Sequence, residues 1–296
     1  MQGSSRSAPP AAWRALLVCV FALAAHGPTA QAQAPAVGIT PGLGDEGKAA
    51  FAEFRAAPTH KAFAIAPGGA WAWQANLPTR EAALAAALEE CAKSASQRCA
   101  PYMIDDGVVF DARAWPALWA PYPTAAQTAQ AAIGNARGQR LYDLALTAPD
   151  GRATHLGALW SAPHTRLLIV HFWGSWCGPC RRELPQLRDA LRALGPKSAI
   201  AAVFIQVREP VATARAWLTE QHLDLPVFDS GARDERDARL RLADGRTMND
   251  REIAPAFPST YVLDSRGVVL FAHAGAVSDW SSYLPLLRHA AQHAGR

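Results

Sequence analysis

Residues 167–180 read Leu-Leu-Ile-Val-His-Phe-Trp-Gly-Ser-Trp-Cys-Gly-Pro-Cys. The apolar run at its start is typical of a buried strand, and the Arg-Arg-Glu-Leu that follows at 181–184 favours a helix. The sequence therefore places two cysteines, with two residues between them, where a buried strand passes into a helix. Such a dithiol can close and reopen a small disulfide, so this position predicts electron exchange with other thiols.

Cys177 is the expected attacking thiol of this pair. It lies at the start of the predicted helix, where unpaired backbone N–H groups and the positive end of the helix dipole favour thiolate. We expect the pKa of its thiol to fall from about 8.5 toward 7. Cys180, one turn further on, would then resolve the mixed disulfide. A static disulfide or half of a metal site are the alternatives for a Cys-x-x-Cys pair.

Composition narrows the possible partners. The chain of 296 residues is long enough for one or two domains with hydrophobic cores. Its 29 basic and 25 acidic residues give a formal net charge of only +4. This balance gives no reason to expect nucleic acid or an anionic membrane as a partner. Because no flavin, nicotinamide or Gly-rich phosphate motif stands out, we expect no cofactor, and we expect no metal.

The first 32 residues have the pattern of a secretory signal peptide. Arg6 and Arg14 form a positive leader, an apolar run covers 15–25, and Ala30-Gln31-Ala32 offers a cleavage site. The run is too short to span a bilayer, which needs about 20 apolar residues. We therefore expect cleavage and a periplasmic location; an uncleaved membrane anchor is the alternative.

Export changes how the cysteines are interpreted, since Cys19 would leave with the signal. The four that remain form two close pairs, which in an exported protein favour two disulfides. We expect a redox-active Cys177–Cys180 disulfide and a structural Cys91–Cys99 disulfide, with a second redox pair as the alternative for Cys91–Cys99. Zinc binding by all four is disfavoured because a long proline-rich stretch separates the pairs and no His has a finger-like spacing.

Patterning divides the part before the dithiol domain into three segments. We expect a flexible leader over 33–58 with a short helix at 45–57, a small α+β domain over 59–112, and a Pro/Ala-rich linker over 113–137. Within the small domain the patterns predict strands at 61–66 and 70–75, a helix at 78–91 and a hairpin over 102–110.

The remainder, 138–296, alternates strand and helix patterns. The expected elements are a hairpin around Pro149-Asp150-Gly151, strands at 167–173, 199–207, 225–228, 257–264 and 268–271, and helices ending at 194, 222 and 293. This order predicts a mixed α/β sheet with helices on both faces.

With these features in place, 138–296 resembles the thioredoxin fold, and in particular its exported TlpA/ResA-like branch. The resemblance is carried by the Pro-Asp-Gly hairpin, the run 172–185 around the dithiol, and 258–267, which reads Pro-Ser-Thr-Tyr-Val-Leu-Asp-Ser-Arg-Gly. It implies a thioredoxin fold and a thiol–disulfide oxidoreductase. The resemblance also associates Gly178-Pro179 between the cysteines with reducing members, near the roughly −270 mV of thioredoxin.

The resemblance further implies roles for residues outside the dithiol. Pro258 would be cis beside the dithiol and leave the backbone of Phe257 free to pair with a substrate strand. Glu183 would manage proton transfer, with a solvated helix residue as the alternative. His171 stands where thioredoxin has a buried Asp. Its titration range suits the same task, and a satisfied core histidine is the alternative.

The sequence thus predicts an exported enzyme that reduces disulfides in other exported proteins, such as cytochrome c precursors or metal-site apoproteins. Trp176, adjacent to Cys177, is the expected docking contact. Without a cofactor, re-reduction requires a membrane thiol carrier as electron donor. Oxidation or isomerisation of substrate thiols is the alternative direction, and a binding or adaptor protein that uses the N-terminal domain is the alternative class.

Overall fold

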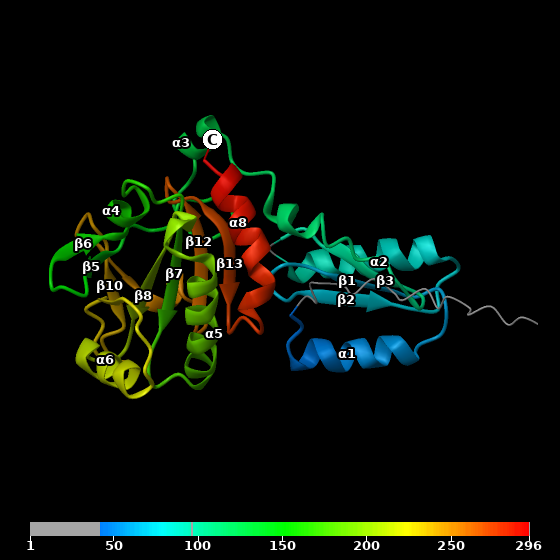
Figure 1. The fold of residues 1–296 in the computed structure, drawn as a ribbon, viewed down its shortest axis with the longest axis horizontal. Coiled ribbons are helices and arrows are strands. Elements are labelled where there is room, and N and C mark those ends of the chain that lie inside the picture. Colours follow the sequence, from blue (N-terminus) through cyan, green and yellow to red (C-terminus); the bar gives the residue numbers. More distant parts are fainter. Residues whose placement is uncertain (1–41, 96, 296) are drawn as a thin grey trace, which may run out of the picture. The chain divides into compact units, whose positions relative to one another are not determined.

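The computed structural model describes residues 42–95 and 97–295, and these contain a four-stranded sheet and a seven-stranded sheet (Figure 1). The predicted signal peptide and its cleavage site lie outside the described residues. Among the helices of the described residues, none combines the length and the apolar composition that crossing a membrane requires.

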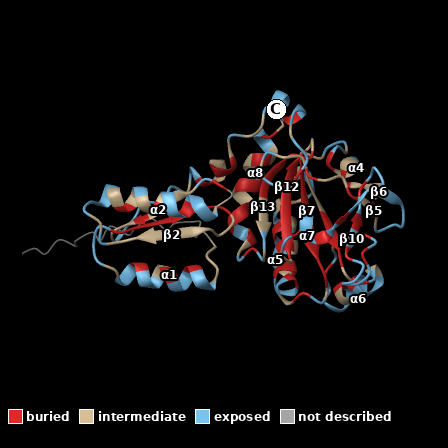
Figure 2. Ribbon diagram, turned by 180° about the vertical axis from the view of Figure 1, so that it is seen from behind, coloured by how far each residue is buried: buried red, intermediate tan, exposed pale blue. Residues whose placement is uncertain are grey.

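The smaller sheet is antiparallel, in the order β2-β1-β3-β4. Its strands are β1 (Ala62–Ile65), β2 (Trp71–Gln74), β3 (Ala100–Ile104) and β4 (Gly107–Val108), and its helices are α1 (Asp45–Ala56) and α2 (Arg80–Ser94). The two helices lie on opposite faces of this sheet, as Figures 1 and 2 both show. Buried alanines line the α2 side, whereas aromatic residues line the α1 side, where the rings of Phe54 and Phe63 lie 5.5 Å apart.

A disulfide ties this unit together. Cys91 near the end of α2 is bonded to Cys99 just before β3, with the two Cα atoms 6.2 Å apart. The prediction of a small disulfide-linked α+β unit is therefore confirmed. The expected flexible leader over 33–58 differs from the structure in its second half. There α1 forms part of this unit, because Phe54 is fully buried.

The segment expected to be a linker, 113–137, is packed rather than free. It contains the 3₁₀ helix η1 (Trp115–Trp119) and the short helix α3 (Ala125–Ala129). Trp115 and Trp119 are buried, and the Trp119 ring stacks on Phe271 with 5.0 Å between centroids. Proline in the first turn of η1 is compatible with a helix start, so prolines that suggest a linker here accompany a buried turn.

The larger sheet has the order β13-β12-β7-β8-β9-β5-β6. Its strands are β5 (Ala145–Thr147), β6 (Ala153–His155), β7 (Leu167–Trp173), β8 (Ile200–Gln206), β9 (Val227–Asp229), β12 (Ser259–Asp264) and β13 (Val269–Ala274). Strand β7 pairs in parallel with β8 and antiparallel with β12. Every residue of β7 is buried, as expected for a central strand covered on both faces.

Helices α5 (Gly178–Leu194), α6 (Val211–Glu220) and α8 (Leu284–His293), with the 3₁₀ helix η3 (Trp280–Tyr283), contribute to the core on one face of this sheet. The other face is covered by α4 (Leu156–Trp160), α7 (Asp250–Ile253) and a hairpin of β10 (Arg239–Arg241) and β11 (Thr247–Asn249). Figure 2 shows the buried strands between these layers. The predicted thioredoxin-like mixed sheet is confirmed, with the β10–β11 hairpin as an element that was not predicted.

Candidate active site

The dithiol lies where β7 passes into α5. Cys177 is the N-cap residue of α5, and its sulfur accepts a hydrogen bond from the backbone N–H of Cys180 at 3.2 Å. The two cysteines form a disulfide with their Cα atoms 5.2 Å apart. Cys177 is 4% exposed and Cys180 is fully buried. Only Cys177 is therefore open to an incoming partner, and it faces the unpaired N–H groups of the first helical turn.

A buried carboxylate anchors the turn before the dithiol. Glu209 accepts a hydrogen bond from the Ser175 backbone N–H at 2.6 Å and another from the Ser175 hydroxyl at 2.5 Å. Glu209 is 6% exposed. It follows β8, so its contact with the dithiol turn depends on the parallel pairing of β7 and β8. Sequence reasoning missed Glu209, and a local pattern gives no signal for it.

Trp176 joins the dithiol turn to a second part of the chain. Its indole N–H donates to the carbonyl of Val207 at 3.0 Å, and its ring meets the Phe257 ring edge-on at 5.4 Å. Trp176 is 45% exposed. The structure thus brings the expected docking residue together with the residue before Pro258, 81 positions later in the printed sequence.

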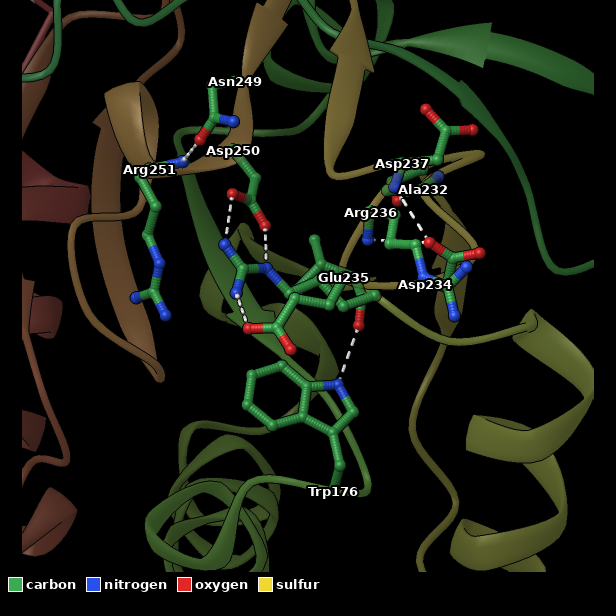
Figure 3. A network of polar contacts seen from close by, with 12 residues as sticks. Trp176, Ala232, Asp234, Glu235, Arg236, Asp237, Asn249, Asp250 and Arg251 are labelled. Atoms are coloured by element: carbon green, nitrogen blue, oxygen red, sulfur yellow. Dashed lines mark hydrogen bonds and ion pairs between the residues drawn. The ribbon is translucent and has the colours of Figure 1, made fainter.

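Two arginines surround Phe257. The Arg251 guanidinium lies 4.4 Å and that of Arg208 5.4 Å from the ring centroid. Arg208 is held by buried Asp250 through hydrogen bonds of 2.6 and 2.8 Å (Figure 3), and by Glu235 at 3.3 Å. Cation–π contacts of this kind fix the ring orientation. The aromatic pair Trp176–Phe257 therefore stands beside a cationic border.

Phe257 has a free backbone. The peptide bond between Phe257 and Pro258 is cis, as the resemblance implies, and β12 begins at Ser259. Within the described residues, neither the N–H nor the C=O of Phe257 hydrogen-bonds to another group. An extended peptide can therefore pair with Phe257 without displacing an existing bond.

Gly178 and Pro179 occupy the first turn of α5, between the cysteines. A Cβ built on Gly178 would lie 3.7 Å from Nη1 of Arg182, which is ordinary contact. Pro179 has no backbone N–H, a property that suits the first turn of a helix. These two residues set the spacing of the dithiol.

Glu183 is buried on α5, so it is not a solvated helix residue. Its Oε1 accepts hydrogen bonds from the Trp280 indole N–H at 2.7 Å and the Val277 backbone N–H at 3.2 Å. Oε2 has no hydrogen-bond partner among the described residues. Burial raises the pKa of this carboxyl from 4.5 to about 7, and the two donors offset part of that rise. Sequence reasoning found Glu183 but missed Trp280.

His171 is buried in β7. Its Nδ1 lies 2.9 Å from the Thr260 hydroxyl on β12, and its Nε2 has no partner in the described part of the chain. Burial lowers the pKa of His171 from 6.5 to about 3. At neutral pH the imidazole is therefore uncharged, and protonating it in place is costly.

Zinc binding by all four cysteines, which the sequence disfavours, would require them at one place. The structure instead bonds them as two pairs, one in each sheet-containing unit. A slightly exposed sulfur at a helix N-terminus, a fully buried partner sulfur and a cis-proline strand on a mixed sheet define a thiol–disulfide oxidoreductase of thioredoxin fold.

Comparisons with known proteins agree with this class. The sequence model of the AhpC/TSA family matches residues 138–272. Thioredoxin-like protein YneN of Bacillus subtilis is 26% identical over 147 residues, 49% of this chain and 76% of that protein. A thioredoxin of Mycolicibacterium smegmatis is 30% identical over 89 residues, 30% of this chain and 77% of that protein. The chain belongs to the thioredoxin family.

A further relative is a ResA protein. The thiol-disulfide oxidoreductase ResA of Geobacillus kaustophilus is 26% identical over 102 residues, which make up 34% of this chain. The match spans 51% of the length of that relative. The predicted likeness to the ResA branch and the predicted enzyme class are thereby confirmed.

Proposed function

We propose that this protein is an exported reductase that transfers two electrons from the Cys177–Cys180 dithiol to disulfides of other exported proteins. The observation that carries the proposal is a disulfide between a helix-capping, slightly exposed Cys177 and a fully buried Cys180. This asymmetry gives one sulfur access to a substrate and reserves the other for the internal step. The reducing direction is supported by the resemblance that the Gly178-Pro179 dipeptide carries.

In the first step, the reduced Cys177 thiolate attacks one sulfur of a substrate disulfide. The substrate S–S bond breaks, a mixed disulfide forms, and the substrate's other sulfur leaves as a thiolate that takes a proton from water. The N–H groups at the start of α5 stabilise the Cys177 thiolate before attack. The Cys180 N–H is already directed at that sulfur at 3.2 Å.

In the second step, Cys180 loses its proton and attacks the Cys177 sulfur. The mixed disulfide breaks, the Cys177–Cys180 disulfide forms, and the second substrate sulfur leaves as a thiolate. We assign the proton from Cys180 to Glu183, because a carboxyl whose pKa is about 7 can accept and release a proton near neutral pH. His171 suits this task less well, since burial lowers its pKa to about 3.

Substrate docking is assigned to the surface around Trp176 and Phe257. The exposed Trp176 ring offers apolar area, and the unpaired backbone groups of Phe257 offer two hydrogen bonds to an extended segment. Pro258, Gly178 and Pro179 complete the border of the dithiol in this proposal. Backbone pairing is tolerant of sequence, so a range of protein substrates fits.

Each reduction leaves the dithiol oxidised, and a donor must return two electrons. A membrane thiol carrier is the proposed donor, and cytochrome c precursors or metal-site apoproteins are the proposed substrates. These assignments depend on export through the N-terminal signal, which also defines the proposed periplasmic location. The structural Cys91–Cys99 disulfide is consistent with an oxidising compartment.

The direction is tested by equilibrating the protein with glutathione buffers and measuring the oxidised fraction by mass spectrometry. A reductase is expected to have a potential near the roughly −270 mV of thioredoxin. A potential near about −120 mV, typical of a strong oxidant, would contradict the reducing direction.

The need for the dithiol is tested with insulin reduction and with a trap. Cys177→Ser is expected to abolish reduction, whereas equal activity would favour the adaptor alternative, in which the N-terminal unit binds a partner. Cys180→Ser leaves mixed disulfides unresolved. We expect it to retain exported proteins with exposed disulfides, and retention of none would contradict the proposed substrates.

A further inference from the structure

The segment 277–283 lies between the Glu183 carboxyl and the N-terminal lobe, by which we mean the described residues of 42–119. On one side, its Val277 backbone N–H and Trp280 indole N–H both donate to Oε1 of Glu183. Within the described residues, Glu183 makes no ion pair. These two N–H groups are therefore the contacts that favour the charged form of this carboxyl.

On its other side, the segment is held by the N-terminal lobe. The Trp115 indole N–H donates to the Ser282 carbonyl at 3.0 Å, and the Gly68 backbone N–H donates to the Tyr283 hydroxyl oxygen at 2.5 Å. The Ser278 hydroxyl donates to the Gly42 carbonyl at 2.9 Å. Trp115, Trp280 and Tyr283 are all buried. The Trp115–Ser282 bond is therefore made in the packed interior and the Gly68–Tyr283 bond at its edge, whereas the Ser278–Gly42 bond is exposed.

We propose that the N-terminal lobe is a positioning element for the redox site, because it holds the segment whose two N–H groups orient and stabilise the Glu183 carboxylate. Trp280 is the positioning residue that contacts Glu183, and Trp115 and Tyr283 act through it. The relevance to thiol chemistry rests on the proposed function, in which Glu183 accepts the proton of Cys180. The proposal thus assigns a role to the N-terminal lobe, which lies outside the thioredoxin-like part.

Other ionisable groups near this carboxyl do not replace the two donors. Cys177 and Cys180 precede Glu183 on α5, and His171 on β7 is uncharged at neutral pH. On the segment itself, burial raises the pKa of Tyr283, which stays neutral. Asp279 is half-buried, and its carboxylate accepts hydrogen bonds from the backbone N–H and the hydroxyl of Ser281. On α8, Arg288 donates to Ala193 near the end of α5, so it does not pair with Glu183.

The chain offers a matched control for the lobe contact. Trp119, like Trp115, is a buried indole of η1, but its N–H makes no hydrogen bond within the described residues. Trp115→Phe and Trp119→Phe therefore remove similar ring volume, and only the first removes a hydrogen bond to the segment. Trp280→Phe removes a donor to Glu183 directly.

The test is a pH titration of the Glu side-chain carboxyl carbon by ¹³C NMR on the oxidised protein, in which Cys177 and Cys180 are bonded to each other and do not titrate. Glu183→Gln assigns the signal. Trp280→Phe is expected to raise the Glu183 midpoint by about one pH unit, the effect of losing a hydrogen bond to a charged group. Trp115→Phe is expected to raise it by a smaller amount, and Trp119→Phe to leave it unchanged.

The proposal is overturned if Trp280→Phe leaves the midpoint in place, or if Trp115→Phe and Trp119→Phe give the same midpoint. Should Trp280→Phe fail to fold, the comparison of the two η1 variants decides. Tyr283→Phe, which removes the acceptor of the Gly68 N–H, is a second lobe variant with the same expected direction. The titration reports on the carboxyl whether or not the protein reduces disulfides. Failure of the proposed function would appear separately, as wild-type protein that does not reduce insulin.

Discussion

Glu183 and His171 are the two buried ionisable side chains nearest the dithiol in sequence, and burial gives them opposite pKa shifts. The pKa of Glu183 rises to about 7 and that of His171 falls to about 3. Burial favours the neutral form of each group, so Glu183 stays protonated to a higher pH and His171 stays unprotonated to a lower pH than in water. Of the two, only Glu183 changes charge near neutral pH.

The sequence predicts both candidates but does not rank them. Their positions relative to the dithiol suggest proton transfer, yet the charge state of Glu183 depends on Trp280, 97 positions away. Likewise, Glu209 reaches Ser175 across 34 positions. Contacts of this kind arise from strand pairing and helix packing, which local patterns do not encode.

Glu183→Gln tests proton transfer at this site. In wild-type protein, the rate at which Cys180 resolves a Cys177 mixed disulfide is expected to rise as pH increases through about 7, where Glu183 becomes a carboxylate. Glu183→Gln removes the acceptor, so the rate above that pH should fall by roughly tenfold or more. Rapid-quench mass spectrometry of the mixed disulfide measures it. An exposed carboxyl, changed as Glu220→Gln, is the control. Equal pH profiles for Glu183→Gln and wild type would remove the carboxyl from the mechanism.

Trp176→Ala tests the docking surface. Loss of the exposed indole should lower kcat/KM for insulin by about tenfold, the rate equivalent of 1.4 kcal/mol of lost contact. Oxidised glutathione, too small to span the surface, should react at the wild-type rate. Steady-state kinetics on both substrates measure the ratio. A parallel loss on both would show that Trp176 supports the dithiol turn, through its bond to Val207, rather than docking.

Among helices and strands, the sequence predicts those elements whose hydrophobic pattern lies within the element itself. The buried run of β7, the start of α5 at the dithiol and the strands around Pro258 all follow from apolar patterning and motif spacing. The β10–β11 hairpin was missed, although Leu240 and Met248 alternate with exposed residues on either side of a turn with Gly245 at positive φ. That pattern is a hairpin signal.

The segment 113–137 differs from the expected linker for another reason. Its prolines and small residues suggested a linker, but Trp115 and Trp119 are fully or nearly fully buried. Two tryptophans carry enough apolar area to favour packing. Here the Trp115 ring packs against Phe110 and the Trp119 ring against Phe271. Which surface such residues cover is decided by tertiary contacts.

The Cys91–Cys99 disulfide is expected to stabilise its unit without taking part in exchange. It closes a loop of sequence separation 8, for which loss of the crosslink should lower the free energy of unfolding by about 2–3 kcal/mol. The double variant Cys91→Ala, Cys99→Ala measures this by urea denaturation. Insulin reduction at 25 °C should be unchanged. A large loss of reduction in folded protein would instead favour a second redox pair.

For the protein as a whole, Glu183 and His171 make the free energy of unfolding depend on pH in opposite directions. The folded protein holds the Glu183 proton more tightly than the unfolded chain, so the stability from this group is fully present below pH 4.5 and lost as pH rises through about 7. For His171 the folded pKa is depressed, so stability is present above pH 6.5 and lost as pH falls toward about 3.

Glu183→Gln separates these contributions. Wild-type protein loses stability as Glu183 ionises between pH 5 and pH 7.5, and the variant has no carboxyl to ionise. The free energy of unfolding of the oxidised variant, relative to that of the wild type, should therefore rise by about 2.4 kcal/mol over this range. Because His171 is present in both proteins, its contribution cancels in the comparison. Urea denaturation at the two pH values measures the difference. A constant difference would mean that Glu183 ionises as readily in the fold as in the unfolded chain.

The proposed role of Cys177 as the nucleophile depends on the start of α5, which stabilises its thiolate. Timed alkylation of the reduced protein with iodoacetamide across pH, with peptide mapping of Cys177 and Cys180, tests this directly. If Cys177 reacted faster than Cys180 only because it is more accessible, the ratio of the two alkylation rates would not reveal a lowered pKa. The pH midpoint of the Cys177 alkylation rate does reveal it, because accessibility does not move that midpoint. We predict a Cys177 midpoint clearly below that of the same cysteine in the urea-denatured chain. Coincident midpoints would contradict stabilisation of the thiolate by the helix.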